Sequence, residues 1–154
     1  AIVKKKCKSQ LMFLGCALAL TACGGGGDSS SSDIAGPDAN NNGVRDDVEA
    51  YINTRYLVAP QKAAVLQLAR SFQKQLLVNK TDKPAVKLSL LAGAYAVHCV
   101  YSKFDGNSPF QPSAVVEEIE SVTTNTKARL LAYRAFSKAA DGTTLTIPER
   151  DSCE

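Results

Sequence analysis

The stretch AVKLSLLAGAYAVHCVYSKF, residues 85–104, decides the fold. Wound into a helix, it points large apolar side chains to nearly every side, among them Leu88, Tyr95 and Tyr101. A helix of this kind is usually the buried centre of a bundle. The preceding TDKP, residues 81–84, is a helix-start signal with a capping side chain and an early proline. We therefore expect this helix at the middle of the protein.

Four further segments repeat apolar residues at three-to-four-residue spacing, which is typical of helices that bury one face. Leu57 to Pro60 is expected to end the first of them, and Asp141-Gly142 is a stop signal for the last. The tail, residues 143–154, is expected to be extended. These elements predict an all-α, compact bundle of four to five helices, with an extended C-terminal tail. The four segments are residues 45–56, 61–79, 113–122 and about 124–140.

Composition and charge narrow the classes of function. The chain has 154 residues, of which 45% are hydrophobic, enough to fill the core of one domain. It carries 18 Lys and Arg against 15 Asp and Glu, but four of the lysines precede residue 23. Residues 23–154 hold 14 basic and 15 acidic side chains, a formal charge of −1. A nucleic-acid partner is not expected, because its binding face needs a basic excess.

The N-terminus has the features of an export signal. Lysines in residues 1–10 precede the apolar run LMFLGCALALTA, residues 11–22. Twelve residues rise about 18 Å as a helix, too short for a hydrocarbon core of about 30 Å. We find no later stretch that is long and apolar enough to span. The predicted divisions are a signal peptide at 1–22, an anchor and linker at 23–33, and a domain at 34–154.

The end of this signal, Leu20-Thr21-Ala22-Cys23, resembles the lipobox of bacterial lipoproteins. The resemblance implies that Cys23 becomes the first mature residue and carries the lipid. The residue after it is Gly24 and not Asp. In this the chain resembles Gram-negative lipoproteins that are sent on to the outer membrane. The alternatives are lipidation at Cys16, which would halve the apolar run, and an ordinary cleaved signal. The Gly/Ser segment GGGGDSSSSD, residues 24–33, has an expected reach of about 15–20 Å.

One loop carries the pattern of a metal site. Residues 38–49 match D-x-[DN]-x-[DN]-G-x5-E at every specified position, which is a calcium-loop signature because calcium prefers oxygen ligands. The loop resembles EF-hands and, more closely, thrombospondin-type-3-like and dockerin-like loops. Gly36 and Pro37 exclude an entering helix, and Arg45 replaces the usual aliphatic residue. We expect a weak Ca2+ site, on the order of 10⁻⁴–10⁻³ M. The expected ligands are Asp38, Asn40, Asn42, the Val44 carbonyl, Asp46 and Glu49.

The alternative for this loop is an Asn/Asp/Gly turn that caps a helix without metal. The residues from Asn42 to Asp47, NGVRDD, are loosely similar to a loop that precedes helices in uncharacterised proteobacterial lipoproteins. That resemblance implies no activity.

Two cysteines remain beyond the signal and Cys23, namely Cys99 and Cys153. In an exported domain such a pair most often forms a disulfide, here closing a loop of about 55 residues. Two buried thiols, or a dimer through Cys153, are the alternatives. A nucleophile pair of His98 and Cys99 is disfavoured, because adjacent helical residues point about 100° apart.

The remaining charged residues favour ordinary surface roles. Arg129 and Arg134 with Tyr133 are candidates for a groove that binds an acidic partner, but a solvated helix face is the simpler interpretation. Glu117, Glu118 and Glu120 are interpreted as a charged helix face.

No catalytic motif is found. We expect a non-enzymatic, lipid-anchored envelope protein that presents a surface to another envelope protein or to the cell wall. The alternatives are an inhibitor or exclusion factor, which blocks an envelope enzyme or phage component, and an enzyme of unknown class.

Overall fold

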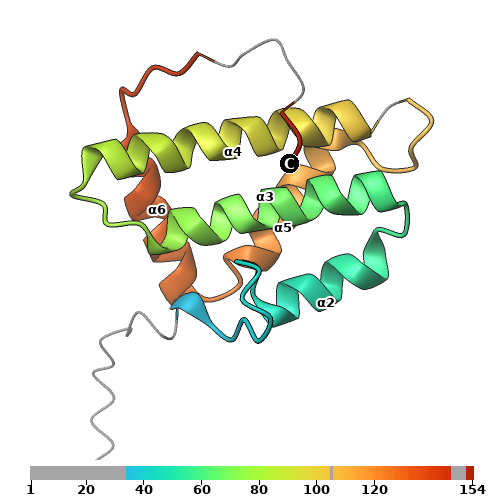
Figure 1. The fold of residues 1–154 in the computed structure, drawn as a ribbon. Coiled ribbons are helices and arrows are strands. Elements are labelled where there is room, and N and C mark those ends of the chain that lie inside the picture. The colour runs from blue at the N-terminus through green and yellow to red at the C-terminus, as the bar shows by residue number, and fades with distance from the viewer. Residues whose placement is uncertain (1–33, 105, 147–151) are drawn as a thin grey trace, which may run out of the picture.

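The structure, a computed structural model, describes residues 34–104, 106–146 and 152–154. The lipobox, Cys23 and the Gly/Ser linker lie outside these residues. The described ranges contain five helices and no strand, which confirms the all-α prediction (Figure 1). Residues 143–146 and 152–154 are not helical, as expected for the tail, and 147–151 are outside the described part. The helices are α2 (Asp46–Arg55), α3 (Ala59–Leu77), α4 (Lys83–Lys103), α5 (Pro112–Thr123) and α6 (Lys127–Ala140).

The helix boundaries follow the predicted signals, with one difference. Pro60 does not precede α3 but lies in its first turn, where a missing backbone N–H costs nothing because that group has no helical partner. At the start of α4, the Asp82 carboxylate accepts a hydrogen bond from the Ala85 backbone N–H at 3.0 Å. After α6, Gly142 adopts a φ of 72°, in agreement with the predicted stop.

The central helix is α3, and the expectation that residues 85–104 form the buried centre is wrong. Ten of the 19 residues of α3 are buried. α4 buries a single stripe, and its outer face leaves Leu88 63% and Tyr101 52% exposed. The ribbon shows why: α3 runs between α4 and α2, with α5 and α6 crossing behind it (Figure 1). α3 packs against all four other helices, so more of its circumference is covered.

Buried polar side chains of α3 find partners in distant segments. Gln67 donates to the Ser152 carbonyl at 2.9 Å, and Gln73 donates to the Ala35 carbonyl at 2.7 Å. The Gln75 amide donates to the carbonyl of Ser89, on α4, at 3.3 Å. A buried amide is costly only when its groups lack partners, so these bonds allow polar residues at the centre of the bundle.

The approach of α3 and α4 depends on a glycine. A Cβ atom at Gly93 would lie 2.4 Å from the Gln75 Nε2 atom, far inside van der Waals contact. Glycine therefore gives the Gln75 side chain the space that it needs to reach Ser89.

By length and composition alone, α4 could cross a membrane. The expectation that no later stretch is long and apolar enough to span is therefore wrong on these two criteria. A core helix passes the same test, and α4 contributes Val86, Ala96 and Val100 to the interior of the bundle.

α6 packs one face inward. Phe136 joins Val86 in a small apolar cluster, and the ring of Tyr133 meets Phe72 edge-on with centroids 5.9 Å apart. The opposite face of α6 is exposed, as the bulky Leu130 and Leu131 show.

Candidate metal centre

The 38–49 loop is closed by its own side chains before α2 begins. The Asp38 carboxylate accepts hydrogen bonds from the backbone N–H groups of Asn42, at 3.1 Å, and Gly43, at 2.9 Å. Gly43 has a φ of 80°, a conformation that favours glycine and turns the chain sharply. The Asp46 backbone N–H, at the first residue of α2, donates to the Pro37 carbonyl at 2.9 Å. The loop therefore folds back on its own entrance.

Hydrogen bonds join five of the six expected ligand residues. The Asn40 Nδ2 atom donates to Glu49 Oε2 at 3.0 Å, so the second and the last of the expected ligands are side by side. The Asn40 oxygen accepts from the Asn42 N–H at 3.1 Å, and Asn42 in turn is bonded to Asp38. These contacts bring four expected ligands together within the loop: Asp38, Asn40, Asn42 and Glu49.

Val44 joins this group through its N–H, and Asp46 instead contacts Ala39. The Asp46 Oδ1 atom accepts from the Ala39 N–H at 2.9 Å. Val44 was expected to contribute its carbonyl, and its backbone N–H donates to Asn42 Oδ1 at 2.8 Å while its side chain is buried in the core. In the described ranges, no group of three or more His, Cys, Asp or Glu side chains is positioned to hold a metal ion. Each loop carboxylate is bonded to loop N–H groups, which calcium would have to displace or share.

Arg45, which departs from the calcium-loop pattern, binds the loop to the C-terminal end of α5. Only 1% of the residue is exposed. Its guanidinium donates to the Thr123 and Val122 carbonyls, both at 3.2 Å, and to Asn125 Oδ1 at 3.3 Å. A cation there satisfies the last carbonyls of α5 and complements the negative end of the helix dipole. An aliphatic side chain could do neither.

Asp47 completes the contacts of Arg45. Its carboxylate accepts two hydrogen bonds from the guanidinium, one of them at 3.0 Å. Burial raises the pKa of Asp47, but the hydrogen bonds and charge of Arg45, with the Val48 N–H and the charge of Arg129, outweigh that effect and leave the pKa below its usual 3.8. Asp47 therefore stays ionised opposite Arg45 at neutral pH.

Two further arginines hold the entrance of the loop. The Arg70 Nε atom, on α3, donates to the Asn42 carbonyl at 2.9 Å. Arg129, on α6, donates to the Ile34 carbonyl at 3.1 Å and to Asn125 at 2.8 Å. The interpretation of Arg129 as part of an outer face is therefore wrong: it is a buried tie between the start of the described chain and α6. A Cβ atom at Gly36 would lie 2.3 Å from Arg45 Cδ, so the entrance passes directly over that side chain.

A cavity of about 500 Å³ lies between the loop and the C-terminal half of α3. Arg70, Lys74 and Leu77 line its α3 side, and Asp38 and Gly43 line its loop side. The buried Oε1 atom of Gln73, another lining residue, has no hydrogen-bond partner among the described atoms.

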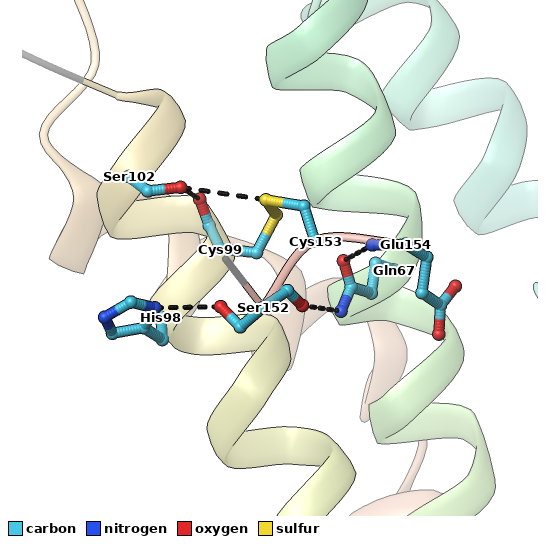
Figure 2. The surroundings of a disulfide bond; sticks show 7 residues. All are labelled: Gln67, His98, Cys99, Ser102, Ser152, Cys153 and Glu154. Carbon is cyan, nitrogen blue, oxygen red and sulfur yellow. Dashed lines mark hydrogen bonds between the residues drawn. A yellow bond between two sulfur atoms is a disulfide. The ribbon is translucent and has the colours of Figure 1, made fainter. Parts of the chain in front are cut away.

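The C-terminal strap, residues 152–154, is attached to α3 and α4 beside the loop. Cys99 and Cys153 form the predicted disulfide, and His98 lies 2.8 Å from the Ser152 hydroxyl (Figure 2). Because the Cys99 sulfur is in this bond, it offers no thiol to a neighbouring base. Arg70 pairs with the Glu154 carboxylate and also binds the loop at Asn42, so one side chain connects the strap to the loop.

Two of the glutamates interpreted as a plain charged face make specific contacts. Glu118 accepts hydrogen bonds from Tyr51, from Tyr56 at 3.0 Å and from Arg55 at 3.1 Å. These bonds connect α5 to α2 and to the residue that follows α2. Burial raises the pKa of Glu118, but the three donors outweigh it and lower the pKa below 4.5. Glu120 accepts from the Tyr133 hydroxyl at 3.1 Å.

Tyr133 itself is half-buried, and burial together with Glu120 raises its pKa to about 12. Glu117 and Arg134 are exposed, in agreement with the sequence interpretation.

Sequence reasoning missed the attachment points of the loop. The one available signal was Arg45 itself, since an arginine at an aliphatic position of a buried turn must find several acceptors. Those acceptors lie 77 to 80 residues further along the chain, where no local pattern marks them.

Comparison with family models, with curated proteins and with solved structures gives no match. Function must therefore be inferred from the residues and their geometry.

Proposed function

We propose that this chain is a lipid-anchored cell-envelope protein of a Gram-negative outer membrane. In this proposal the 38–49 loop binds Ca2+, and the helical domain is a non-enzymatic binding or structural module. Its partner is another envelope protein or the cell wall. The support comes from the lipobox resemblance, which covers residues 20–23, and from the geometry of the loop.

One contact carries the calcium proposal: the 3.0 Å hydrogen bond between Asn40 Nδ2 and Glu49 Oε2. An asparagine amide has an oxygen and a nitrogen at equivalent ends, so a half turn of the side chain presents its oxygen to Glu49 instead. Two oxygens at that separation can both lie about 2.3–2.6 Å from one calcium ion. Asp38 and Asn42 are hydrogen-bonded to each other next to them and supply further oxygens.

The proposed role of calcium is structural. In the sequence, the loop lies between the Gly/Ser linker, which serves as the tether, and the helices. Arg45 binds it to the C-terminal end of α5, and Arg70 binds it to the C-terminal strap. A cation among the carboxylates stabilises the loop in the conformation that these arginines hold. Calcium therefore raises the stability of the whole domain without any change of fold.

The test is thermal unfolding of the chain from residue 24 onward in EDTA, magnesium or calcium. Binding to the folded state adds RT ln(1 + [L]/Kd), so a calcium concentration of ten times Kd should add about 1.4 kcal/mol. Asp38→Ala and Glu49→Ala should abolish the calcium-dependent increment, whatever they do to the stability in EDTA. Glu117→Ala, an exposed acid outside the loop, should leave the increment intact. No increment at several millimolar calcium would make the loop a helix-capping turn.

The lipid anchor has its own test. The full chain, expressed in a Gram-negative host, should sediment with membranes, and mass spectrometry should find acylated Cys23 at the mature N-terminus. Cys23→Ser should release the protein, whereas Cys16→Ser should not. A mature N-terminus at any other residue contradicts the proposal.

A second candidate function is inhibition of an envelope enzyme or a phage component. The cavity between the loop and α3 favours it, since it offers Lys74 and the half-exposed Leu77 to a partner. Leu77→Asp should then abolish a stoichiometric complex with the partner. The control, Leu57→Asp, makes the same substitution at a more exposed leucine and should leave the complex intact. A complex that survives both changes contradicts this use of the cavity.

A further inference from the structure

The outer face of α6 has an unusual composition for an exposed helix. It combines two half-exposed leucines, Leu130 at 47% and Leu131 at 53%, with the basic residues Lys127, Arg134 and Lys138. At about 100° per residue these five side chains fall within about 100° of arc, so they share one side of the helix. The helix sequence KARLLAYRAFSKAA contains no acid. We name these five residues the α6 basic face.

The fold leaves this face unused. The inner side of α6 is occupied by Phe136, Tyr133 and Arg129, which contact the bundle. The ion pairs formed among the described residues involve Arg45, Arg55 and Arg70, and none involves Lys127, Arg134 or Lys138. Leu130 and Leu131 are adjacent and lie between the basic residues, so apolar and basic groups meet on this one face.

We infer that the α6 basic face docks the domain onto an anionic phospholipid surface. A helix with basic residues and leucines on one side binds in the plane of a membrane interface, where leucine enters the acyl boundary and the bases meet phosphate groups. The whole domain is not attracted to such a surface, because residues 23–154 have a formal charge of −1. Only a local basic face can make the contact.

The position of the tether supports a lipid surface rather than an acidic protein. The described chain begins at Ile34, and its carbonyl accepts a hydrogen bond from Arg129, in the first turn of α6. Cys23 lies eleven residues upstream. The reach expected from the linker composition, about 15–20 Å, exceeds the 10–12 Å diameter of a helix. A lipid on Cys23 therefore brings the membrane within reach of the outer side of α6. This step, alone in the argument, rests on the proposed anchor.

The test uses the chain from residue 24 onward, which keeps every described helix and the disulfide but has no lipid. It should bind vesicles of equal parts phosphatidylcholine and phosphatidylglycerol, and not vesicles of phosphatidylcholine alone. One basic residue near an anionic surface is worth about a fivefold change in partition. The triple variant Lys127→Glu, Arg134→Glu, Lys138→Glu should lower the partition coefficient by at least about a hundredfold.

A matched control separates this face from the overall charge. Lys62→Glu, Lys74→Glu, Lys87→Glu changes the net charge equally on α3 and α4, and should lower partition by less than about threefold. Leu130→Ser with Leu131→Ser should lower it by about tenfold, since both side chains leave the acyl boundary. Leu57→Ser with Leu88→Ser should have little effect. Urea unfolding of each variant confirms that it is folded.

Three outcomes overturn the inference: no binding to the mixed vesicles at low salt, equal losses in the two triple variants, or binding to soluble polyglutamate but not to vesicles. The last would assign the face to an acidic protein. Failure of the anchor is a different result, because it appears as unmodified Cys23 in the full chain while the chain from residue 24 still binds vesicles.

Discussion

α3 and α4 are adjacent helices of nearly equal length, and they reverse the order of burial that their hydropathy predicts. α4 is the more apolar, yet it leaves Leu88 and Tyr101 in solvent. α3 contains buried Gln67, Gln73 and Gln75 and lies at the centre. Burial here follows position in the bundle, and polar residues are tolerated where other segments supply hydrogen-bond partners.

The three glutamines differ from apolar residues in what they demand. Each binds the backbone of a different segment: the loop entrance, α4 or the C-terminal strap. An apolar side chain accepts many neighbours, whereas a buried amide requires one particular neighbour at hydrogen-bond distance. α3 therefore specifies which segments surround it.

The largest expected effect comes from the covalent link across these two helices. Cys99→Ser with Cys153→Ser removes the closure of a 54-residue separation, and should lower the free energy of unfolding by about 4 kcal/mol. Ser102→Ala, which keeps the disulfide, should change it by less than about 0.5 kcal/mol. Urea denaturation measures both. A loss below about 1 kcal/mol would mean that the strap adds little to the α3–α4 pair.

One leucine on each helix tests the burial order directly. Leu68→Ala on α3 should cost about 3 kcal/mol, because the side chain is fully buried and leaves a cavity. Leu88→Ala on α4 should stay within about 0.5 kcal/mol, because the side chain is already in water. Equal losses in denaturant midpoint would contradict the assignment of α3 as the central helix.

Removing a polar partner from the centre sharpens the comparison. Gln67→Leu should cost about 1–2 kcal/mol although it adds apolar character, because it leaves the Ser152 carbonyl and the Glu154 N–H without their partner. Lys87→Leu, on the exposed side of α4, is the control and should be close to neutral. If Gln67→Leu stabilises the protein, then hydropathy rather than hydrogen bonding limits the burial of α3.

The smallest effect should have the opposite sign. The Ser89 hydroxyl, on the buried stripe of α4, has no hydrogen-bond partner among the described atoms. Ser89→Ala keeps the backbone carbonyl that Gln75 binds, removes the unpaired hydroxyl and improves helix propensity. Stability should rise by about 0.5–1 kcal/mol in the same denaturation assay. A fall would show that the hydroxyl has a partner such as a bound water.

Periodicity predicted most of the fold from the sequence. Apolar residues recur at helical spacing, and local signals mark several helix boundaries: Asp82 caps α4, prolines lie in the first turns of α3 and α5, and Gly142 follows α6. The burial order could not be predicted in this way, because it depends on which segments meet at α3. Hydropathy favoured α4, and the partners of Gln67 and Gln73 are 85 and 38 residues away.

The candidate site shows the same division. The spacing from Asp38 to Glu49 can be read from one short stretch, whereas the pairing of Cys99 with Cys153 was expected because no other cysteine follows Cys23. The contacts of Arg45, Arg70 and Arg129 could not be predicted from the sequence. Each arginine donates a hydrogen bond to a segment that is distant along the chain. Arg129 was interpreted as solvated for this reason: its helix pattern is amphipathic, and its acceptor, Ile34, is 95 residues earlier.

The contact of Gln67 with the C-terminal strap has a consequence for how extended chain can be held by helices. The side-chain amide donates to the Ser152 carbonyl and accepts from the Glu154 N–H, at 2.9 and 3.2 Å (Figure 2). A residue of a neighbouring parallel β-strand would bond the same two groups, so the amide imitates one rung of a ladder. Because these two backbone groups already have partners, they are not free to pair with an extended segment of a second chain. Such pairing leads to aggregation when extended segments are left unpaired.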